Sequence, residues 1–275
     1  MAAPISCIVT SYNNQSTLSA ALNSVLNQTL PVAEIVVADD GSTDGSRDII
    51  RAFSEKYDCI RPIFRSDNLG VAANRDLAIR SSQQPFVTHL DGDDRFSQRK
   101  IEREWLALGG QKNSVAYSLI ASVCENKWWR TRVLDPSETV RENDKAFTCL
   151  IERKGAIPRD MLMSRDLFER AGGFNHSIPI YEDWDFKLRL AQCADQWLSS
   201  GVVGTLYFQH SHGLSSKNRE FHLKWQKKIC RQYQEESDFN GYYPGRHLRW
   251  KSVLNTALLT MVRFRDVRET LKMSS

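Results

Sequence analysis

Short apolar runs alternate with amphipathic segments in the first part of the chain, and this alternation limits the fold more than any other feature. The apolar runs have strand length and lie at residues 5–10, 35–38, 60–64 and 86–90. The segments between them repeat apolar residues with the helical period and lie at residues 18–26, 46–57 and 71–80. Strands and helices that alternate in this way indicate a doubly wound parallel sheet. We therefore expect a Rossmann-like, mainly parallel α/β domain.

The second part of the chain has a less regular pattern. After a further predicted helix at 97–108, strands are expected at 115–123, 129–134, 155–163 and 202–208, and helices at 165–170 and after Tyr181. The first two of these strands are expected to form a small sheet extension. Residues 135–145 are polar and are expected to form a loop. From residue 217 onward the pattern predicts only helices.

Polar residues gather where the predicted strands end. Ser11-Tyr12-Asn13 follows the first strand, Asp39-Asp40-Gly41-Ser42 the second, and Asp91-Gly92-Asp93-Asp94 the fourth. The carboxyl ends of parallel strands meet at one edge of a sheet, where such folds bind ligands. The three carboxylates between residues 91 and 94 need a cation, strong donors or open water. A divalent cation chelated by nucleotide phosphates would meet that need, and a solvated turn is the alternative.

The charge is unevenly distributed along the chain. The net charge of +4 is too small to argue for nucleic acid, and we expect no such partner. Residues 217–275 hold thirteen Lys and Arg against six Asp and Glu. This basic amphipathic tail suggests an anionic partner such as a membrane face, and a solvated helical surface is an equal alternative.

Cysteine usage and hydropathy bear on the compartment. The six cysteines are scattered without a Cys-x-x-Cys pair, which fits reduced thiols in the cytoplasm better than a disulfide framework or a zinc site. The N-terminus has no charged leader before an apolar core, and no apolar run reaches the length of a membrane span. We expect a cytoplasmic protein, with peripheral contact at the inner face of the cell membrane as a hypothesis.

Taken in order, these motifs resemble the family-two glycosyltransferases with the GT-A fold, of the type that builds bacterial polysaccharides and cell-surface glycans. The resemblance covers about residues 4–216. It rests on residues 10–13, 39–44, 68–71 with Arg75, 91–94, 172–174, Glu182-Asp183, and His210 with Ser215. It implies a GT-A domain over 1–216, with a nucleotide-binding half at 1–108, an acceptor-binding half at 109–216, and a helical tail at 217–275.

The resemblance assigns Asp40, Tyr12, Thr10 and Arg75, together with Asp93, to the nucleotide-sugar donor. It implies that Asp40 accepts a hydrogen bond from the base, that Tyr12 packs on the base, and that Thr10 supports it. A carboxylate pairs strongly with a buried N–H, which suits the imide of uracil, although guanine offers a similar donor. Arg75 would steady the donor. The alternatives are core packing for Tyr12 and a surface salt bridge for Arg75.

The same resemblance implies a divalent cation, Mn²⁺ or Mg²⁺, as cofactor. Asp93 would contact the ribose or the sugar. Asp94 and His210 would bind the metal, which bridges the two phosphates and neutralises charge on the leaving nucleoside diphosphate. His212 competes with His210 for this role, and Asp91 fits the motif less well than its neighbours.

Asp183 is the expected catalytic base. It stands at a predicted helix start, where a carboxylate can take the proton from an acceptor hydroxyl that attacks the anomeric carbon. The resemblance implies direct displacement with inversion, as in a hexosyltransferase. Glu182 and Asp185 are the nearest rivals. The alternative is that these acids only favour the helix dipole.

The expected function is therefore sugar transfer from a nucleotide diphosphate-sugar, with UDP favoured, to a hydroxyl of a glycan or lipid-linked acceptor. A nucleotidyltransferase is less favoured, because residues 11–14 contain neither the glycine nor the lysine of such enzymes. A non-catalytic sugar-nucleotide binder would be expected to lack Asp94 or Asp183, and both are present. The acceptor should be read by residues 125–160, including Trp128-Trp129, and by the tail. The sugar, the acceptor and the oligomeric state have no motif in the sequence.

Overall fold

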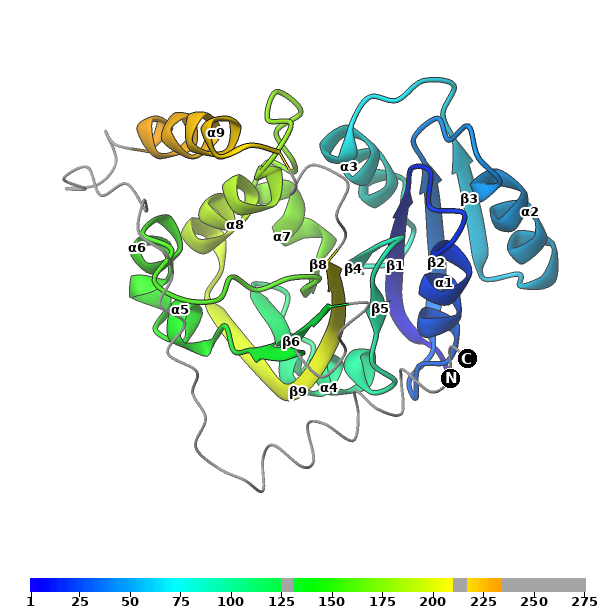
Figure 1. The fold of residues 1–275 in the computed structure, drawn as a ribbon. Coiled ribbons are helices and arrows are strands. Elements are labelled where there is room, and N and C mark those ends of the chain that lie inside the picture. The colour runs from blue at the N-terminus through cyan, green and yellow to red at the C-terminus, as the bar shows by residue number, and fades with distance from the viewer. Residues whose placement is uncertain (125–130, 210–216, 234–275) are drawn as a thin grey trace.

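The computed structural model describes residues 1–124, 131–209 and 217–233 of the 275-residue chain (Figure 1). Several residues singled out in the sequence lie outside this part, and no structural statement is made about them: Trp128, Trp129, His210, His212, Ser215 and residues 234–275.

The first half forms the predicted parallel sheet. Its strands lie in the order β3-β2-β1-β4. They are β1 (Ala3–Ser11), β2 (Val32–Asp39), β3 (Ile60–Phe64) and β4 (Phe86–Asp91). The helices between and after them are α1 (Leu18–Leu26), α2 (Ser46–Lys56), α3 (Val71–Ser81) and α4 (Lys100–Leu108). The central strands are apolar without alternation because helices cover both faces of the sheet (Figure 1).

The second half continues the same sheet, whose full order is β3-β2-β1-β4-β8-β6-β9-β5. The added strands are β5 (Arg95–Phe96), β6 (Ser114–Cys124), β7 (Arg132–Leu134), β8 (Leu162–Ser164) and β9 (Gln196–Gln209). β8 runs antiparallel to both β4 and β6, and β9 runs parallel to β6. β7 pairs with β6 as an antiparallel extension, as the sequence predicted. The expectation that β6 also belongs to this extension was wrong, because β6 lies in the main sheet between β8 and β9.

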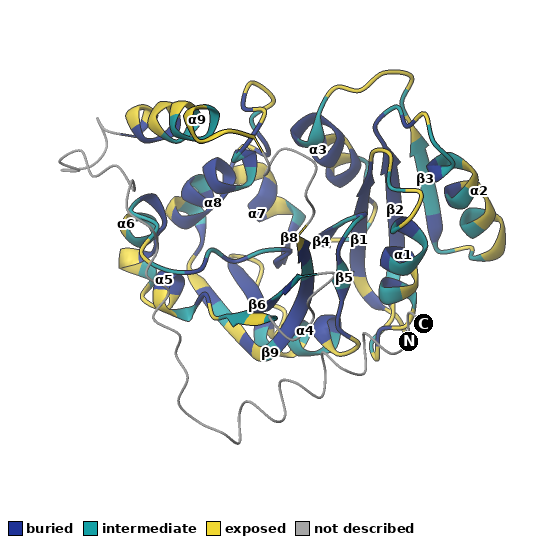
Figure 2. Ribbon diagram, in the orientation of Figure 1, coloured by how far each residue is buried: buried dark blue, intermediate teal, exposed yellow. Residues whose placement is uncertain are grey.

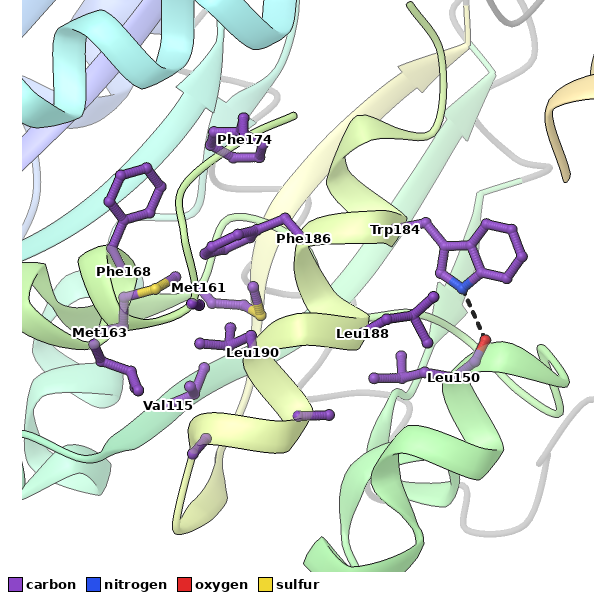
Figure 3. Close-up of a cluster of buried hydrophobic side chains, with 14 of the residues drawn as sticks. Val115, Leu150, Met161, Met163, Phe168, Phe174, Trp184, Phe186, Leu188 and Leu190 are labelled. Carbon is purple, nitrogen blue, oxygen red and sulfur yellow. Dashed lines mark hydrogen bonds between the residues drawn. The ribbon is translucent and has the colours of Figure 1, made fainter. Parts of the chain in front are cut away.

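The helices of the second half are α5 (Ser137–Val140), α6 (Asn143–Ile151), α7 (Arg165–Arg170), α8 (Glu182–Cys193) and α9 (Arg219–Gln232). The prediction of a loop over 135–145 was wrong, because α5 and the start of α6 occupy it. α6 buries Ala146 and Leu150, and the Leu150 carbonyl accepts a hydrogen bond from the Trp184 indole, 2.8 Å away (Figure 3). The strand predicted over 155–163 was also mostly wrong, since only β8 forms beyond Pro158, which lacks a backbone donor.

Two apolar cores flank the sheet, and successive strand residues point into opposite ones. Ile8 and Val36 pack with α3, α6, α7 and α8, whereas Cys7 and Ile35 pack with α1, α2 and α4. Figure 3 shows part of the first core, and Figure 2 shows that the central strands consist almost entirely of buried residues. This alternation follows from the period of two in a strand.

The described start of the basic tail is part of the fold. Ile229 and Cys230 of α9 are buried in the first core. The described part of the tail therefore packs against the core with one side of α9, and is not solvated all round. Within the described ranges, no helix has both the length and the apolar character that a bilayer crossing requires.

Candidate active site

The ends of β1, β2 and β4 place the predicted polar clusters side by side. Thr10 pairs with Asp91 in the register of β1 and β4, and Ser11 pairs with Asp39 in that of β1 and β2. The Thr10 hydroxyl donates to Asp91 Oδ1 over 3.1 Å. The three clusters therefore meet at one edge of the sheet, as expected from strand direction.

Gly92 allows a close approach between two strand ends. Its N–H donates to the Thr10 carbonyl oxygen over 2.8 Å, and a Cβ at position 92 would lie 2.8 Å from that same oxygen. Any larger residue would push β1 away from the acidic segment. The group that approaches Gly92 closely is thus the backbone carbonyl of Thr10.

Arg75 of α3 joins this edge to α8. Its Nη2 lies 2.6 Å from Asp91 Oδ1, and its Nη1 lies 3.1 Å from Glu182 Oε1. The guanidinium also lies over the ring of Phe174, 5.2 Å from its centroid. Only 3% of the Arg75 side chain is exposed, so the alternative of a surface salt bridge was wrong. The buried pair fixes the start of α8 against the end of β4.

Asp183 is the half-buried acid at the start of α8. Its Oδ2 accepts a hydrogen bond from Lys187 Nζ over 2.6 Å, and 39% of its side chain is exposed. Burial alone would raise the pKa of Asp183, but the ammonium of Lys187, with Arg75 and Arg159, lowers it below its usual range. Asp183 is therefore ionised at neutral pH and open to the site.

The two rival acids are enclosed. Burial and the neighbouring Asp183 raise the pKa of Glu182 to about 7, while its carboxylate is paired with Arg75. Asp185 is fully buried, and its oxygens accept from the Tyr233 hydroxyl and from Arg189, each over 2.8 Å. Neither acid is as accessible to a substrate hydroxyl as Asp183.

Asp94 is buried to 1% exposure at the end of the acidic segment. Its Oδ1 accepts the N–H of Phe208 over 2.9 Å, and its Oδ2 lies 2.8 Å from Arg159 Nη2. Burial holds the pKa of Asp94 well above its usual range, although Arg159 lowers it. Asp93 beside it is half-buried.

Arg159 was missed in the sequence. The same Nη2 atom that contacts Asp94 lies 3.2 Å from Asp91 Oδ2, and the guanidinium lies 4.2 Å from the ring centroid of Tyr207. Arg159 stands in the irregular segment between α6 and β8, where no periodicity or motif marks it. Its role depends on contacts between distant segments.

The described residues do not by themselves complete a metal site. They contain no group of three His, Cys, Asp or Glu side chains placed to hold an ion. Asp94 supplies a buried carboxylate, but Arg159 and the Phe208 N–H hold both of its oxygens. A cation at Asp94 would therefore compete with Arg159 for Oδ2. His210, the other expected ligand, lies outside the described ranges.

Asp40 and Tyr12, the two residues expected to contact the nucleotide base, differ in exposure. Asp40 is 3% exposed and accepts the N–H groups of Leu69 and Gly70, at 3.1 and 2.8 Å. Tyr12 is 48% exposed, so the alternative of core packing was wrong for its ring. Asp40 thus ties β2 to the segment before α3, and Tyr12 leaves an aromatic face at the edge of the sheet.

A buried ion pair lies beneath the acidic segment. Lys100 and Glu104 of α4 are both fully buried, with 2.6 Å between Nζ and Oε2. Lys100 also donates to the Asp160 carbonyl over 2.6 Å, and the Ser118 hydroxyl donates to Glu104 over 2.6 Å. Burial raises the pKa of Glu104 to about 7. This pair joins α4 to the segment that carries Arg159.

The sheet, with its acidic edge at the ends of β1, β2 and β4, has the arrangement of the GT-A fold. The chain belongs to glycosyl transferase family 2, whose family model matches residues 6–172. The fold is similar to that of TarS from S. aureus. The crystal structure of TarS residues 1–349 with UDP-GlcNAc gives a TM-score of 0.68 at 18% identity, covering 87% of this chain and 68% of that one.

Curated relatives are similar over shorter segments. A cholesterol galactosyltransferase of Borreliella burgdorferi is 38% identical over 98 residues, which are 36% of this chain and 27% of the relative. An uncharacterized glycosyltransferase of Rickettsia conorii is 26% identical over 238 residues, which are 84% of this chain and 39% of the relative. The chain thus spans less than half the length of these relatives.

Proposed function

We propose that this protein transfers a sugar from a UDP-sugar to a hydroxyl of a glycan or lipid-linked acceptor, with inversion at the anomeric carbon. The observation that carries the proposal is the link from Asp91 through Arg75 to Glu182, which holds Asp183 at the acidic edge of the sheet. The UDP and UDP-GlcNAc complexes of TarS support a nucleotide-sugar donor.

Asp183 acts as the general base in this proposal. The acceptor oxygen attacks the anomeric carbon, the bond from that carbon to the diphosphate oxygen breaks, and the acceptor proton passes to Asp183. A carboxylate kept ionised by Lys187 is ready to accept that proton, because the hydroxyl becomes acidic as its oxygen forms the new bond. Both electrons of the broken bond leave with the nucleoside diphosphate.

The donor roles are those that the family resemblance implies. In this proposal Asp40 contacts the nucleotide base, Tyr12 stacks on it and Thr10 supports it, while Arg75 steadies the donor and Asp93 contacts its ribose or sugar. A divalent cation held by Asp94, with His210 as the expected second ligand, would supply charge neutralisation for the diphosphate. Each oxygen of Asp40 already accepts a backbone N–H, from Leu69 or from Gly70. To contact the nucleotide base, one of these oxygens must accept a second hydrogen bond.

We also propose that the acceptor half, 109–216, recognises the acceptor, and that the protein works in the cytoplasm at the inner membrane face. Lys224 and Lys228 of α9 are exposed and support contact with an anionic surface. Sedimentation with anionic liposomes tests this. A variant truncated after residue 233 retains Ile229 in the core. If this variant no longer binds the liposomes, the membrane contact lies beyond residue 233.

Calorimetry of UDP binding tests the donor site. We expect the intact protein to bind UDP in the presence of Mn²⁺, and Asp94→Asn to lose the metal-dependent part of that affinity. Asp166→Asn, an exposed acid in the first turn of α7, is the matched control. Preference for another nucleotide would change the donor and keep the class. Failure to bind any nucleoside diphosphate would favour a non-catalytic role.

A further inference from the structure

One guanidinium nitrogen bridges two carboxylates of the acidic edge. Arg159 Nη2 lies 2.8 Å from Asp94 Oδ2 and 3.2 Å from Asp91 Oδ2. Arg159 Nε lies 3.9 Å from Asp160 Oδ2. The arginine thus serves as the counter-ion where the acidic segment is most crowded, and no motif of the family was assigned to it.

The contact occupies the oxygen that a cation would need. Asp94 Oδ1 accepts the Phe208 N–H, which leaves Oδ2 as the oxygen for a positive partner. Arg159 takes that oxygen in this structure. A guanidinium and a divalent cation at the same oxygen repel each other, so each weakens the binding of the other to Oδ2.

The remainder of the guanidinium is placed to receive an anion. Its plane is supported by the Tyr207 ring, 4.2 Å from the centroid, and 23% of the side chain is exposed. Nη1 makes no hydrogen bond to any described residue. Nη1 is therefore able to donate a charge-assisted hydrogen bond to a phosphate oxygen.

We propose that Arg159 exchanges partners during donor binding. Without donor it neutralises Asp94, and when a divalent cation arrives with a nucleoside diphosphate, Asp94 takes the cation and Arg159 takes a phosphate oxygen. The exchange rests on the proposed UDP-sugar function. It keeps every charge paired at each stage, because one carboxylate–guanidinium contact is replaced by a carboxylate–cation and a phosphate–guanidinium contact. Asp91 retains Arg75 throughout.

Two titrations of opposite expected sign test the exchange. Mn²⁺ binding without nucleotide is measured from the free-ion signal in electron paramagnetic resonance at pH 8, and UDP binding at saturating Mn²⁺ is measured by calorimetry. In Arg159→Gln we expect Mn²⁺ alone to bind more tightly, by about fivefold or more, because its competitor is gone. We expect UDP to bind about tenfold more weakly, because one charge-assisted contact is lost.

Two further variants make the result interpretable. Arg170→Gln removes the same charge at an exposed site bonded to Asn113, and should leave both constants unchanged. Arg159→Lys keeps the positive charge but lacks the planar guanidinium, so we expect smaller changes in the Mn²⁺ and UDP affinities, in the same directions as in Arg159→Gln. This variant also provides the test if Arg159→Gln does not fold.

Mn²⁺ affinity that is unchanged or weaker, or UDP affinity that is unchanged, would overturn the exchange. The proposed function fails separately, if the unaltered protein itself binds no UDP with Mn²⁺.

Discussion

The ammonium of Lys187 donates a hydrogen bond to the carboxylate of Asp183 one turn away on α8, with 2.6 Å between Nζ and Oδ2. Lys187 is nearly fully buried, with 2% of its side chain exposed, while Asp183 faces the site. The proposed base therefore has a cation on its inner side and an open outer side, which fixes its charge and its orientation together.

Replacing Lys187 with Met should shift the pH profile. The lysine lowers the pKa of Asp183, so its removal raises that pKa and protonates the base at higher pH. We expect the acidic limb of kcat/KM to move to higher pH, with a greater loss of activity at pH 6 than at pH 8. Lys187→Arg should keep the limb near its original place. An unmoved limb in Lys187→Met would exclude this coupling.

Asp183→Asn should separate catalysis from donor binding. Loss of a general base costs typically about 10²–10⁴-fold in rate, so transfer should fall by that order. UDP affinity should stay within about twofold, because Asp183 is not among the residues proposed to hold the nucleotide. Initial rates and calorimetry on the same preparation check both. Comparable loss of transfer in Asp166→Asn would point to instability.

The hydroxyl of Tyr233, the residue that follows α9, should contribute to stability. Tyr233 donates to the buried Asp185 over 2.8 Å, so Tyr233→Phe leaves one carboxylate oxygen without that donor. A hydrogen bond to a charged group is worth about 1.5–3 kcal/mol, and a loss of this size in unfolding free energy is expected. Urea denaturation measures it. Arg231→Ala, at an exposed site on α9, should change stability by less than about 0.5 kcal/mol.

The ion pair of α4 should behave as a unit. Glu104→Ala leaves the buried Lys100 ammonium without its carboxylate and should cost about 3–5 kcal/mol. The double variant Lys100→Met with Glu104→Leu removes both charges and should recover much of that loss. Thermal or urea unfolding of the two variants provides the comparison. A double variant no more stable than the single one would show that the other contacts of Lys100 dominate.

Local patterns were sufficient for the first half of the fold. The observed β3 coincides with its predicted range, and β1, β2 and β4 include theirs, because their Ile and Val runs lie between helices with a clear period. β5 could not be predicted, since a strand of two residues exists only through its pairing with β9. α5 and α6 were hidden because their exposed faces made 135–145 look uniformly polar.

The candidate site divides in the same way. Thr10, Asp40, Asp91 and Asp94 could be grouped in advance, since the ends of parallel strands must meet at one edge. Arg75 could be tied to that edge only by resemblance, and its burial under Phe174 required the tertiary structure. The role of Arg159 could not be predicted from the sequence, because its partners come from two other parts of the chain and its own segment has no regular period.

The bond between Asp94 Oδ1 and the Phe208 N–H joins residues 114 positions apart. During synthesis on the ribosome, Asp94 emerges long before β9 exists to receive it. N-terminal segments of a chain generally begin to fold first, and distant contacts form late. The nascent chain can thus build β1 to β4 early, while the acidic edge stays incomplete until β9 has emerged. Sugar transfer would then begin only when almost all of the described chain has been translated.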